Sequence, residues 1–366
     1  WEENAGYSPS TLAAVIAGLI CAADIARANH AFEMANFLEE YADWIEAHLE
    51  EWTVTDDGVL HPEVKRHYIR INPPRRGERY FREDLGEGML QIANRGPGEK
   101  YIFEAREVVD AGFLELVRYG VRSADDPLIV DSLKVIDKTL KVDAPEGPCW
   151  RRYNHDGYGQ RHDGGPFLGW GQGRAWPILT GERGHYELAA GHDPAIYIRA
   201  LELFASEGGM IPEQIWDAPS LDGMVFGRPT GAAMPLVWAH AEYLKLLRSA
   251  VDGRVFERIS IVQGRYIGEN RHRGNPEIFS LDRPLKEIRV GSTLRVIAEK
   301  RFRILWSVDG WATVNSKEGT NIGFPGSFAD VSVPDAHNGS ISFTLFWPGE
   351  NRWEGSNFDI AIVAGG

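Results

Sequence analysis

Two segments of the chain each place acidic side chains beside tryptophan. They are Trp1-Glu2-Glu3-Asn4, just before an expected helix, and Pro212-Glu213-Gln214-Ile215-Trp216-Asp217. A protonated carboxyl on one loop and an ionised carboxylate on the other would form a general acid and a general base. Because the chain contains 53 Asp and Glu residues, a solvated acidic loop is the alternative explanation for either segment.

The overall composition narrows the choice of partner. The formal net charge is -14 and the chain contains 12 Trp, 12 Tyr and 16 Phe residues. Proteins that bind nucleic acids need clustered Lys and Arg to neutralise phosphates, so this charge argues against them. We expect an uncharged or cationic small partner instead.

Four segments resemble, in this order, the active-site segments of glycoside hydrolase family 15, in its bacterial glucoamylase and glucodextranase form. Beyond Trp1-Glu2-Glu3-Asn4-Ala5-Gly6-Tyr7-Ser8 and the Pro212 segment, they are Arg152-Tyr153-Asn154-His155-Asp156-Gly157-Tyr158 and Trp176-Pro177-Ile178-Leu179-Thr180-Gly181-Glu182-Arg183-Gly184. The resemblance implies the C-terminal part of an (α/α)6 catalytic barrel, followed by the β domain that such relatives carry.

The resemblance also implies roles for individual residues. Glu2 resembles the family's general acid and Glu213 its general base. The residues that resemble sugar-binding positions are Glu3, a second acid; Arg152, which would hold hydroxyls of the terminal glucose; and the aromatic residues Trp1 and Trp176.

These residue types suit the implied chemistry. An inverting glycosidase separates its two carboxyl groups by about 6.5–9.5 Å, which leaves room for the attacking water. Burial beside Trp1 and the charge of Glu3 would raise the pKa of Glu2, whereas Glu213 should stay ionised. Arg152 presents a planar set of donors to sugar hydroxyls, and a salt bridge with Asp156 that only fixes the loop is the alternative.

The expected activity is exo-acting, inverting hydrolysis that releases β-glucose from the non-reducing ends of α-1,4-glucans. An α-1,6 hydrolase of the glucodextranase or isomaltose type and a trehalase remain open, as does a noncatalytic carbohydrate-binding subunit. No cofactor and no metal ligand are expected, although Asp56-Asp57-Gly58 leaves a structural calcium open beside an ordinary turn. We expect a secreted or periplasmic protein, with a cytoplasmic one as the alternative.

Helical periodicity must supply the framework for these loops. It predicts about seven helices before residue 255, which begin at Pro9 or lie over 32–52, 110–119, 127–140, 175–190, 194–206 and 231–251. The long connections 72–98, 144–173 and 208–229 are rich in Gly, Pro, Asp and Trp, and such loops often carry function. The apolar run Leu12–Ile25 is shorter than the roughly 20 residues that span a bilayer, so we expect a core helix and no membrane span.

The pattern changes to period two near residue 253. It predicts strands over 287–290, 293–297, 303–306 and 341–346, and hence a small β-sandwich. We place a catalytic part at 1–254 and the β domain at 255–366. Trp306 and Trp311 in that domain could present a sugar-binding surface, but packing between the sheets is the expectation.

About seven helices are fewer than the twelve of the implied barrel. A chain that starts at Trp1 therefore suggests a cleavage or cloning boundary. We expect a second chain, such as the N-terminal fragment of the same precursor, to cover the apolar faces that would otherwise be exposed. Cys21 and Cys149 are the only cysteines, and a single bridge between them is not ruled out by the sequence.

Overall fold

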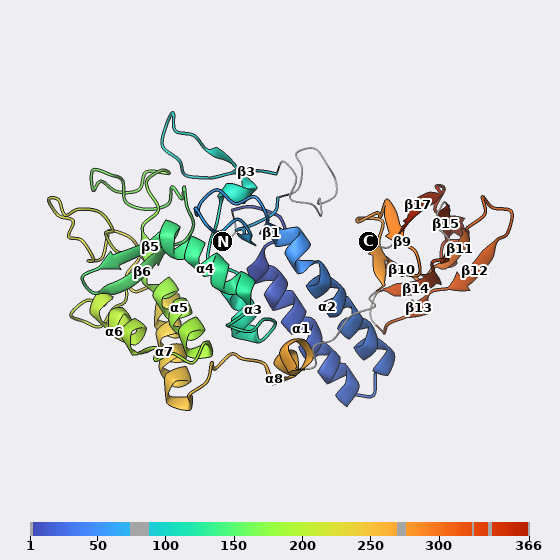
Figure 1. The fold of residues 1–366 in the computed structure, drawn as a ribbon, viewed down its shortest axis with the longest axis horizontal. Helices are drawn as coiled ribbons and strands as arrows, with labels where there is room; N and C mark the ends of the chain where they lie inside the picture. The colour runs from blue at the N-terminus through green and yellow to red at the C-terminus, as the bar shows by residue number, and fades with distance from the viewer. Residues whose placement is uncertain (1–2, 74–87, 269–275, 324–325, 336–338, 365–366) are drawn as a thin grey trace. The chain divides into compact units, whose positions relative to one another are not determined.

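A computed structural model describes residues 3–73, 88–268, 276–323, 326–335 and 339–364. All seven predicted helices are present in these residues, and a short eighth follows them (Figure 1). The helices are α1 Pro9–Ala28, α2 Phe32–Thr53, α3 Leu114–Tyr119, α4 Pro127–Leu140, α5 Pro177–Ala189, α6 Ala195–Phe204, α7 Val237–Asp252 and α8 Ser260–Gln263, with short turns η1 Ala105–Glu107 and η2 Gly264–Gly268.

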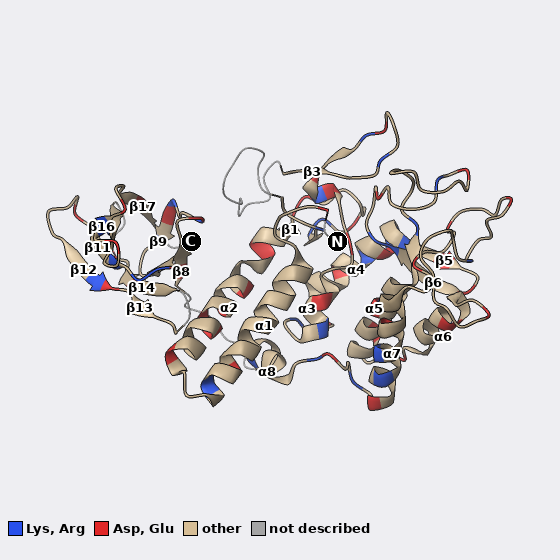
Figure 2. Cartoon of the chain, turned by 180° about the vertical axis from the view of Figure 1, so that it is seen from behind, with Lys and Arg blue, Asp and Glu red and all other residues tan. Residues whose placement is uncertain are grey.

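Helix α1 begins where the sequence predicts. The Ser8 hydroxyl accepts a hydrogen bond from the Thr11 backbone N–H at 3.3 Å, and Pro9, which has no N–H to satisfy, opens the helix. By length and composition α1 could also cross a bilayer, and 44 % of its most apolar 18-residue window is buried. Acidic residues lie along α2 (Figure 2), and two of them, Asp43 and Glu46, are buried.

The chain divides into two compact units, which differ from the expected division at residues 254 and 255. Unit 1 contains Trp1–Ala17 and His48–Asn270, and unit 2 contains Gly18–Ala47 and Arg271–Gly366. The difference has two causes. Residues 260–268 are still helical, and part of the α1–α2 hairpin packs with the β-strands, as in the cluster that Phe37, Leu38 and Ile322 share.

Helix α5 is central to unit 1, since it packs against α3, α6, α7 and strand β6. Gly181 and Gly184 allow α7 to approach closely. A methyl group on Gly181 would lie 2.5 Å from Cγ of Glu242, and one on Gly184 would lie 2.7 Å from Cδ2 of Leu246. The Gly-x-x-Gly spacing of this segment is therefore a packing feature.

Unit 1 also contains short strands that hydrophobic periodicity did not indicate. Strands β5 Lys141–Ala144, β6 Gly147–Arg151 and β7 Ala175–Trp176 form one antiparallel sheet in the order β5-β6-β7. Two further antiparallel pairs join β1 Val54–Thr55 to β2 His67–Tyr68 and β3 Met89–Gln91 to β4 Ile102–Glu104.

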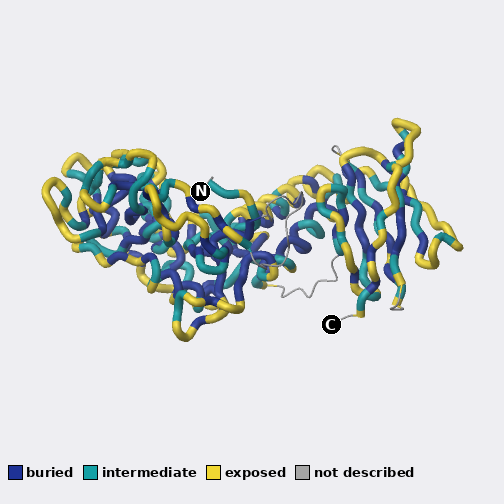
Figure 3. The backbone as a smooth tube through the Cα atoms, turned by 90° about the horizontal axis from the view of Figure 1, so that it is seen from above, coloured by how far each residue is buried: buried dark blue, intermediate teal, exposed yellow. Residues whose placement is uncertain are grey.

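Unit 2 contains two sheets that share one hydrophobic core, which is a sandwich arrangement. Phe279 on one sheet meets Phe343 on the other edge to face, with ring centroids 4.9 Å apart. In Figure 3, buried and partly buried stretches alternate along the longer strands β14 and β15. The first sheet contains β13 Thr320–Asn321, β14 Ser327–Ser332, β10 Thr293–Ala298 and β8 Glu277–Phe279; the second contains β12 Asn315–Glu318, β11 Arg303–Ser307, β15 Ser340–Trp347, β17 Phe358–Val363, β9 Glu287–Arg289 and β16 Arg352–Trp353.

The two tryptophans of the β11 region have different positions. Trp306 packs against the core of the sandwich, which confirms the expectation for that residue. Trp311 follows β11 and lines a surface pocket with Leu305 and Trp353, so core packing is wrong for Trp311. Both cysteines are free.

We predict that the Asp126 cap stabilises the start of α4, the helix that leads directly into β5. The Asp126 carboxylate accepts hydrogen bonds from the N–H groups of Leu128 at 2.9 Å and Ile129 at 3.4 Å. Asp126→Ala should lower the free energy of unfolding in urea by about 1 kcal/mol, as for other helix caps. Asp125→Ala is the matched control, because Asp125 accepts from the Ser123 hydroxyl and caps no helix. Equal losses in the two variants would contradict the capping role.

Candidate active site

The β5-β6-β7 sheet brings three of the predicted site residues into neighbouring positions. Arg152 directly follows β6, and Trp176 ends β7, which pairs with β6. Ala175 of β7 is in turn bridged to Ile215, whose N–H donates to the Ala175 carbonyl at 3.0 Å. The loop that carries Glu213 therefore continues the sheet beyond its last strand.

Arg152 is buried, with 6 % of its surface exposed, and one edge of its guanidinium group pairs with Asp156. Nε and Nη2 donate to the two carboxylate oxygens of Asp156, both at 2.8 Å. The aromatic rings of Tyr158 and Trp176 lie 5.0 and 5.3 Å from the guanidinium carbon. The predicted salt bridge to Asp156 is thus present, and it holds Arg152 in one orientation.

Glu3 joins the same cluster. Its Oε1 accepts from Nη2 of Arg152 at 3.2 Å, while Oε2 accepts from the Tyr153 hydroxyl and from Nη2 of Arg70 at 3.3 Å. Asn4 is held alongside it, because its side-chain oxygen accepts from Nη1 of Arg70 at 3.0 Å. These contacts fix the backbone that follows Trp1 and Glu2, which themselves lie outside the described residues.

Glu213 lies on the loop that continues the sheet beyond β7. It is buried, with 8 % of its surface exposed, and Oε1 has no hydrogen-bond partner among the described residues. Burial raises the pKa of this carboxyl, while a hydrogen bond from Tyr158 and the charge of Arg152 act to lower the pKa. A carboxylate with a free buried oxygen is able to accept a proton from a bound molecule.

Arg151 and Arg174 hold the Glu213 loop through Asp217. Asp217 accepts from Nε of Arg151 at 2.6 Å and from Nη1 of Arg174 at 2.9 Å. The guanidinium carbon of Arg174 also lies 3.9 Å from the ring centroid of Trp216, which is fully buried. This packing explains why Trp and Asp follow Glu213 closely: they fix the loop and do not face a ligand.

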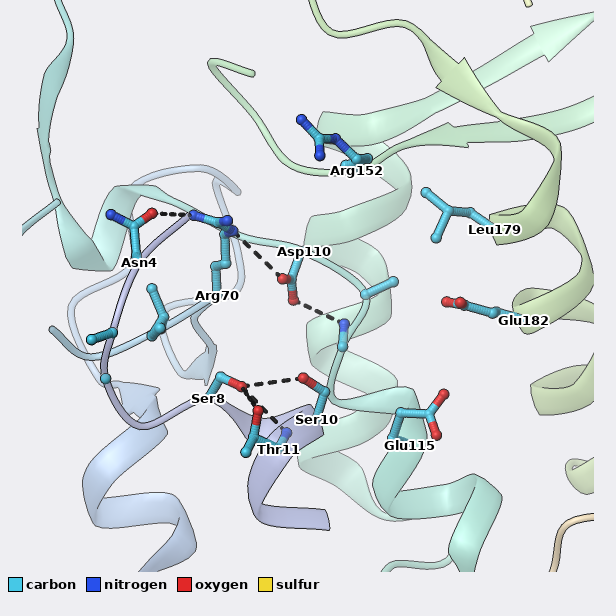
Figure 4. A pocket seen from close by; sticks show the side chains of 15 residues that line it. Asn4, Ser8, Ser10, Thr11, Arg70, Asp110, Glu115, Arg152, Leu179 and Glu182 are labelled. Atoms are coloured by element: carbon cyan, nitrogen blue, oxygen red, sulfur yellow. Dashed lines mark hydrogen bonds and ion pairs between the residues drawn. The ribbon is translucent and has the colours of Figure 1, made fainter. Parts of the chain in front are cut away.

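A cavity of about 300 Å³ opens beside this cluster, with Arg152 on its wall (Figure 4). Arg70 pairs there with Asp110, whose carboxylate lies 3.9 Å from Nε of Arg70 and accepts from the Gly112 N–H at 2.8 Å. Glu182 from α5 and Glu115 from α3 line the opposite side. Glu213 is not among the residues that line this cavity, and the charge of Arg152 acts on that carboxyl.

Burial raises the pKa values of the acids that line this cavity. The pKa of Glu182 is raised to about 8, mainly by burial and then by the nearby charges of Glu115 and Glu242. Burial also raises the pKa values of Glu115 and Asp110. A neutral carboxyl group both donates and accepts hydrogen bonds, so the cavity suits an uncharged ligand that carries hydroxyl groups.

Sequence patterns alone missed several of these residues. Arg70 and Asp110 each interrupt an apolar run, Tyr68-Ile69-Arg70-Ile71 and Val108-Val109-Asp110-Ala111, and a charge within buried chain is the signal that could have found them. Glu182 lies within a segment that the sequence singled out, but no role was assigned to it. His67 is a further polar residue that is fully buried, in β2.

The other candidate ligand groups are engaged within the protein. Asp56 pairs with Arg66 at 3.0 Å, and Asp57 pairs with Arg106. Across the described ranges, no three His, Cys, Asp or Glu side chains are grouped so that they could hold a metal ion.

Comparisons with known proteins find that the chain is similar to glucoamylases. A glucoamylase from Clostridium sp. (strain G0005) is 45 % identical over 269 residues, which is 74 % of this chain and 36 % of that protein. A crystal structure of a bacterial glucoamylase complexed with acarbose matches 73 % of this chain with a TM-score of 0.65 and 47 % identity, and the match covers 37 % of that chain. This chain thus spans little more than a third of either relative.

The family model for glycosyl hydrolases family 15 matches residues 1–248, about two thirds of the chain. These residues include Glu3, Arg152, Trp176 and Glu213. The chain therefore belongs to glycosyl hydrolases family 15.

Proposed function

We propose that this chain carries both catalytic carboxyl groups of an exo-acting, inverting glycoside hydrolase that releases β-glucose from the non-reducing ends of α-1,4-glucans. Glu2 would donate a proton to the departing glycosidic oxygen, and Glu213 would take a proton from the attacking water. The bond between the sugar carbon and the leaving oxygen breaks as the water oxygen bonds to the opposite face of that carbon.

The observation that carries the proposal is the environment of Glu213. Its buried Oε1 has no hydrogen-bond partner among the described residues. Tyr158, whose ring lies 5.0 Å from the guanidinium carbon of Arg152, donates a hydrogen bond to the carboxylate. Two nearby carboxylates that hold arginines, Asp217 and Asp156, use both of their oxygens. An oxygen left open in this way is available to a water molecule.

The surrounding groups support a sugar as the substrate. A pyranose ring has apolar C–H faces and an edge of hydroxyl groups, so it needs aromatic surfaces together with planar donors and acceptors. Trp176, Tyr158 and Arg152 supply both kinds of contact within one cluster. The relatives' names, glucoamylase in both cases, favour α-1,4 linkages, while α-1,6-glucans and trehalose are the alternative substrates.

We also propose that the helices of unit 1 form part of an (α/α)6 barrel that a second polypeptide completes. Val237, Leu244 and Val251 recur every seven residues along α7, which places them on one stripe of the helix. All three are more than 60 % exposed. An apolar stripe of this kind is typical of a face that another segment covers.

The first prediction concerns Glu213. Glu213→Gln should lower kcat on maltooligosaccharides by roughly 10²–10⁴-fold, because the amide cannot accept the proton from water. Glucose release is measured on the complete assembly, with isomaltooligosaccharides and trehalose in parallel to rank the linkages. Glu207→Gln, an exposed acid near the same loop, should leave kcat unchanged. Near-full hydrolysis by well-folded Glu213→Gln would reject the proposal, and binding without turnover by the wild type would favour a noncatalytic subunit.

The second prediction concerns pH. Glu213 must be ionised to act as a base, so activity should fall as pH drops through its pKa, and burial sets that acid limb above the usual glutamate value of 4.5. Tyr158→Phe removes a hydrogen bond that lowers the pKa, so the acid limb of kcat/KM should move to still higher pH. Tyr101→Phe, at a half-exposed ring, should not move it. A limb that stays in place or moves to lower pH in Tyr158→Phe would contradict this assignment.

The third prediction concerns assembly. Size-exclusion chromatography with mass analysis should find the isolated chain above its monomer mass of 40.9 kDa, because the α7 stripe associates when it is uncovered. Serine substitutions at Val237, Leu244 and Val251 together should raise the monomer fraction, whereas Ile25→Ser, at another exposed apolar position, should not. A stable, monomeric and active species of 40.9 kDa would contradict the need for a second polypeptide.

A further inference from the structure

A second pocket lies in unit 2, on the outer face of the larger sheet. Leu305 of β11 and Thr344 of β15 are direct cross-strand partners, and their neighbours Ile304, Phe343 and Leu345 point into the sandwich core. Because side chains alternate along a strand, Leu305 and Thr344 face outward. Both line a cavity of about 440 Å³.

The outer face of this sheet exposes aromatic side chains, which is unusual for a solvated surface. An antiparallel sheet normally has polar side chains on its solvated face, but this pocket is lined by Trp311 and Trp353, together with Val314. Trp353 is 49 % exposed and Val314 is 54 % exposed. The Trp353 ring is supported by Phe346, whose centroid lies 5.0 Å away.

Trp311 is held in place by its own loop. It has a left-handed backbone with φ of 72°, which is costly for a bulky residue and often occurs at functional sites. The Ser307 hydroxyl accepts from the Trp311 N–H at 2.9 Å, and the Asp309 carboxylate accepts from the Thr313 N–H at 2.8 Å. The indole is thus presented by a turn that is fixed before any ligand arrives, which reduces the entropy cost of binding.

The remaining lining residues determine which ligand fits. None of the residues that line the pocket carries a charge. The pocket therefore offers no opposite charge to pair with an ionic ligand. Thr344 and Asn357 place hydroxyl and amide groups beside the two indoles. Apolar ring faces next to neutral donors and acceptors match the C–H faces and hydroxyl edge of a pyranose.

We propose that this pocket is an accessory carbohydrate-binding site, in which Trp311 and Trp353 stack against glucose units of an α-glucan chain. The choice of an α-glucan rests on the proposed function of unit 1. The pocket performs no chemistry, since its lining contains no acid or base; it retains the polymer on the protein.

The test is native affinity electrophoresis of the full chain in gels that contain soluble amylopectin, dextran or hydroxyethylcellulose. Every variant also carries Glu213→Gln, so that the polymer is not consumed. Amylopectin should slow migration, and Trp311→Ala and Trp353→Ala should each weaken the apparent affinity roughly tenfold, as expected when an aromatic residue central to a binding site is lost. Phe256→Ala, which removes another exposed ring, should have no effect. Trp353→Phe should retain part of the binding, and far-ultraviolet circular dichroism checks the fold of each variant.

Each other result would overturn the proposal. Unchanged retardation in the Trp311→Ala, Trp353→Ala double variant would place glucan binding elsewhere. Equal retardation by hydroxyethylcellulose would reject an α-glucan as the ligand. Self-association that disappears in the double variant, without any glucan effect, would assign the pocket to a contact between copies of the chain.

The same experiment separates this proposal from the one for unit 1. Hydrolysis is measured on short maltooligosaccharides with Glu213 intact. Tryptophan-dependent retardation without hydrolysis would reject only the catalytic proposal, and hydrolysis without such retardation would reject only the accessory site.

Discussion

The proposed active site depends on the burial of one guanidinium group, that of Arg152. Burying a charge costs several kcal/mol unless partners replace the lost water. Nε and Nη2 of Arg152 donate to Asp156, and Nη2 also donates to Glu3. The rings of Tyr158 and Trp176 lie close to the guanidinium group. Glu3 lies in the segment after Glu2, whereas Asp156 lies in the same loop as Arg152. Pairing this one charge therefore orders that segment and the 152–158 loop together.

The acids near Arg152 differ in whether they contact arginine. Glu3 and Asp156 face arginine directly and receive its hydrogen bonds. Within the described part of the chain, Glu182 makes no hydrogen bond or ion pair with an arginine, and burial raises its pKa to about 8. The low dielectric that strengthens the ion pairs therefore also favours a neutral Glu182. A cavity with fixed guanidinium groups and a neutral carboxyl group would suit the hydroxyl groups of the proposed sugar without requiring a charged ligand.

The sequence predicted local features well and distant contacts poorly. The bounds of α4 match because Asp126 and Pro127 form a local start signal. Arg152, Trp176 and Glu213 could be proposed as site residues because they lie in recognisable segments. Strands β5, β6 and β7 were missed, since two to five residues are too few for periodicity. Those strands set the register that places Arg152 beside Trp176. The partners Arg70 and Asp110 depend on tertiary contacts, and only their positions within apolar runs hinted at burial.

The two proposed carbohydrate sites differ in how geometry affects binding. In unit 1, a ligand meets buried charges whose positions are already determined by mutual pairing, so a small displacement would leave a charged group unsatisfied. That requirement favours one defined sugar unit in one orientation. The pocket of unit 2 has no charged lining residue, and stacking on an indole tolerates sliding and rotation of a ring. Selection at the first site and loose retention at the second are therefore consequences of where this sequence buries charge and where it exposes tryptophan.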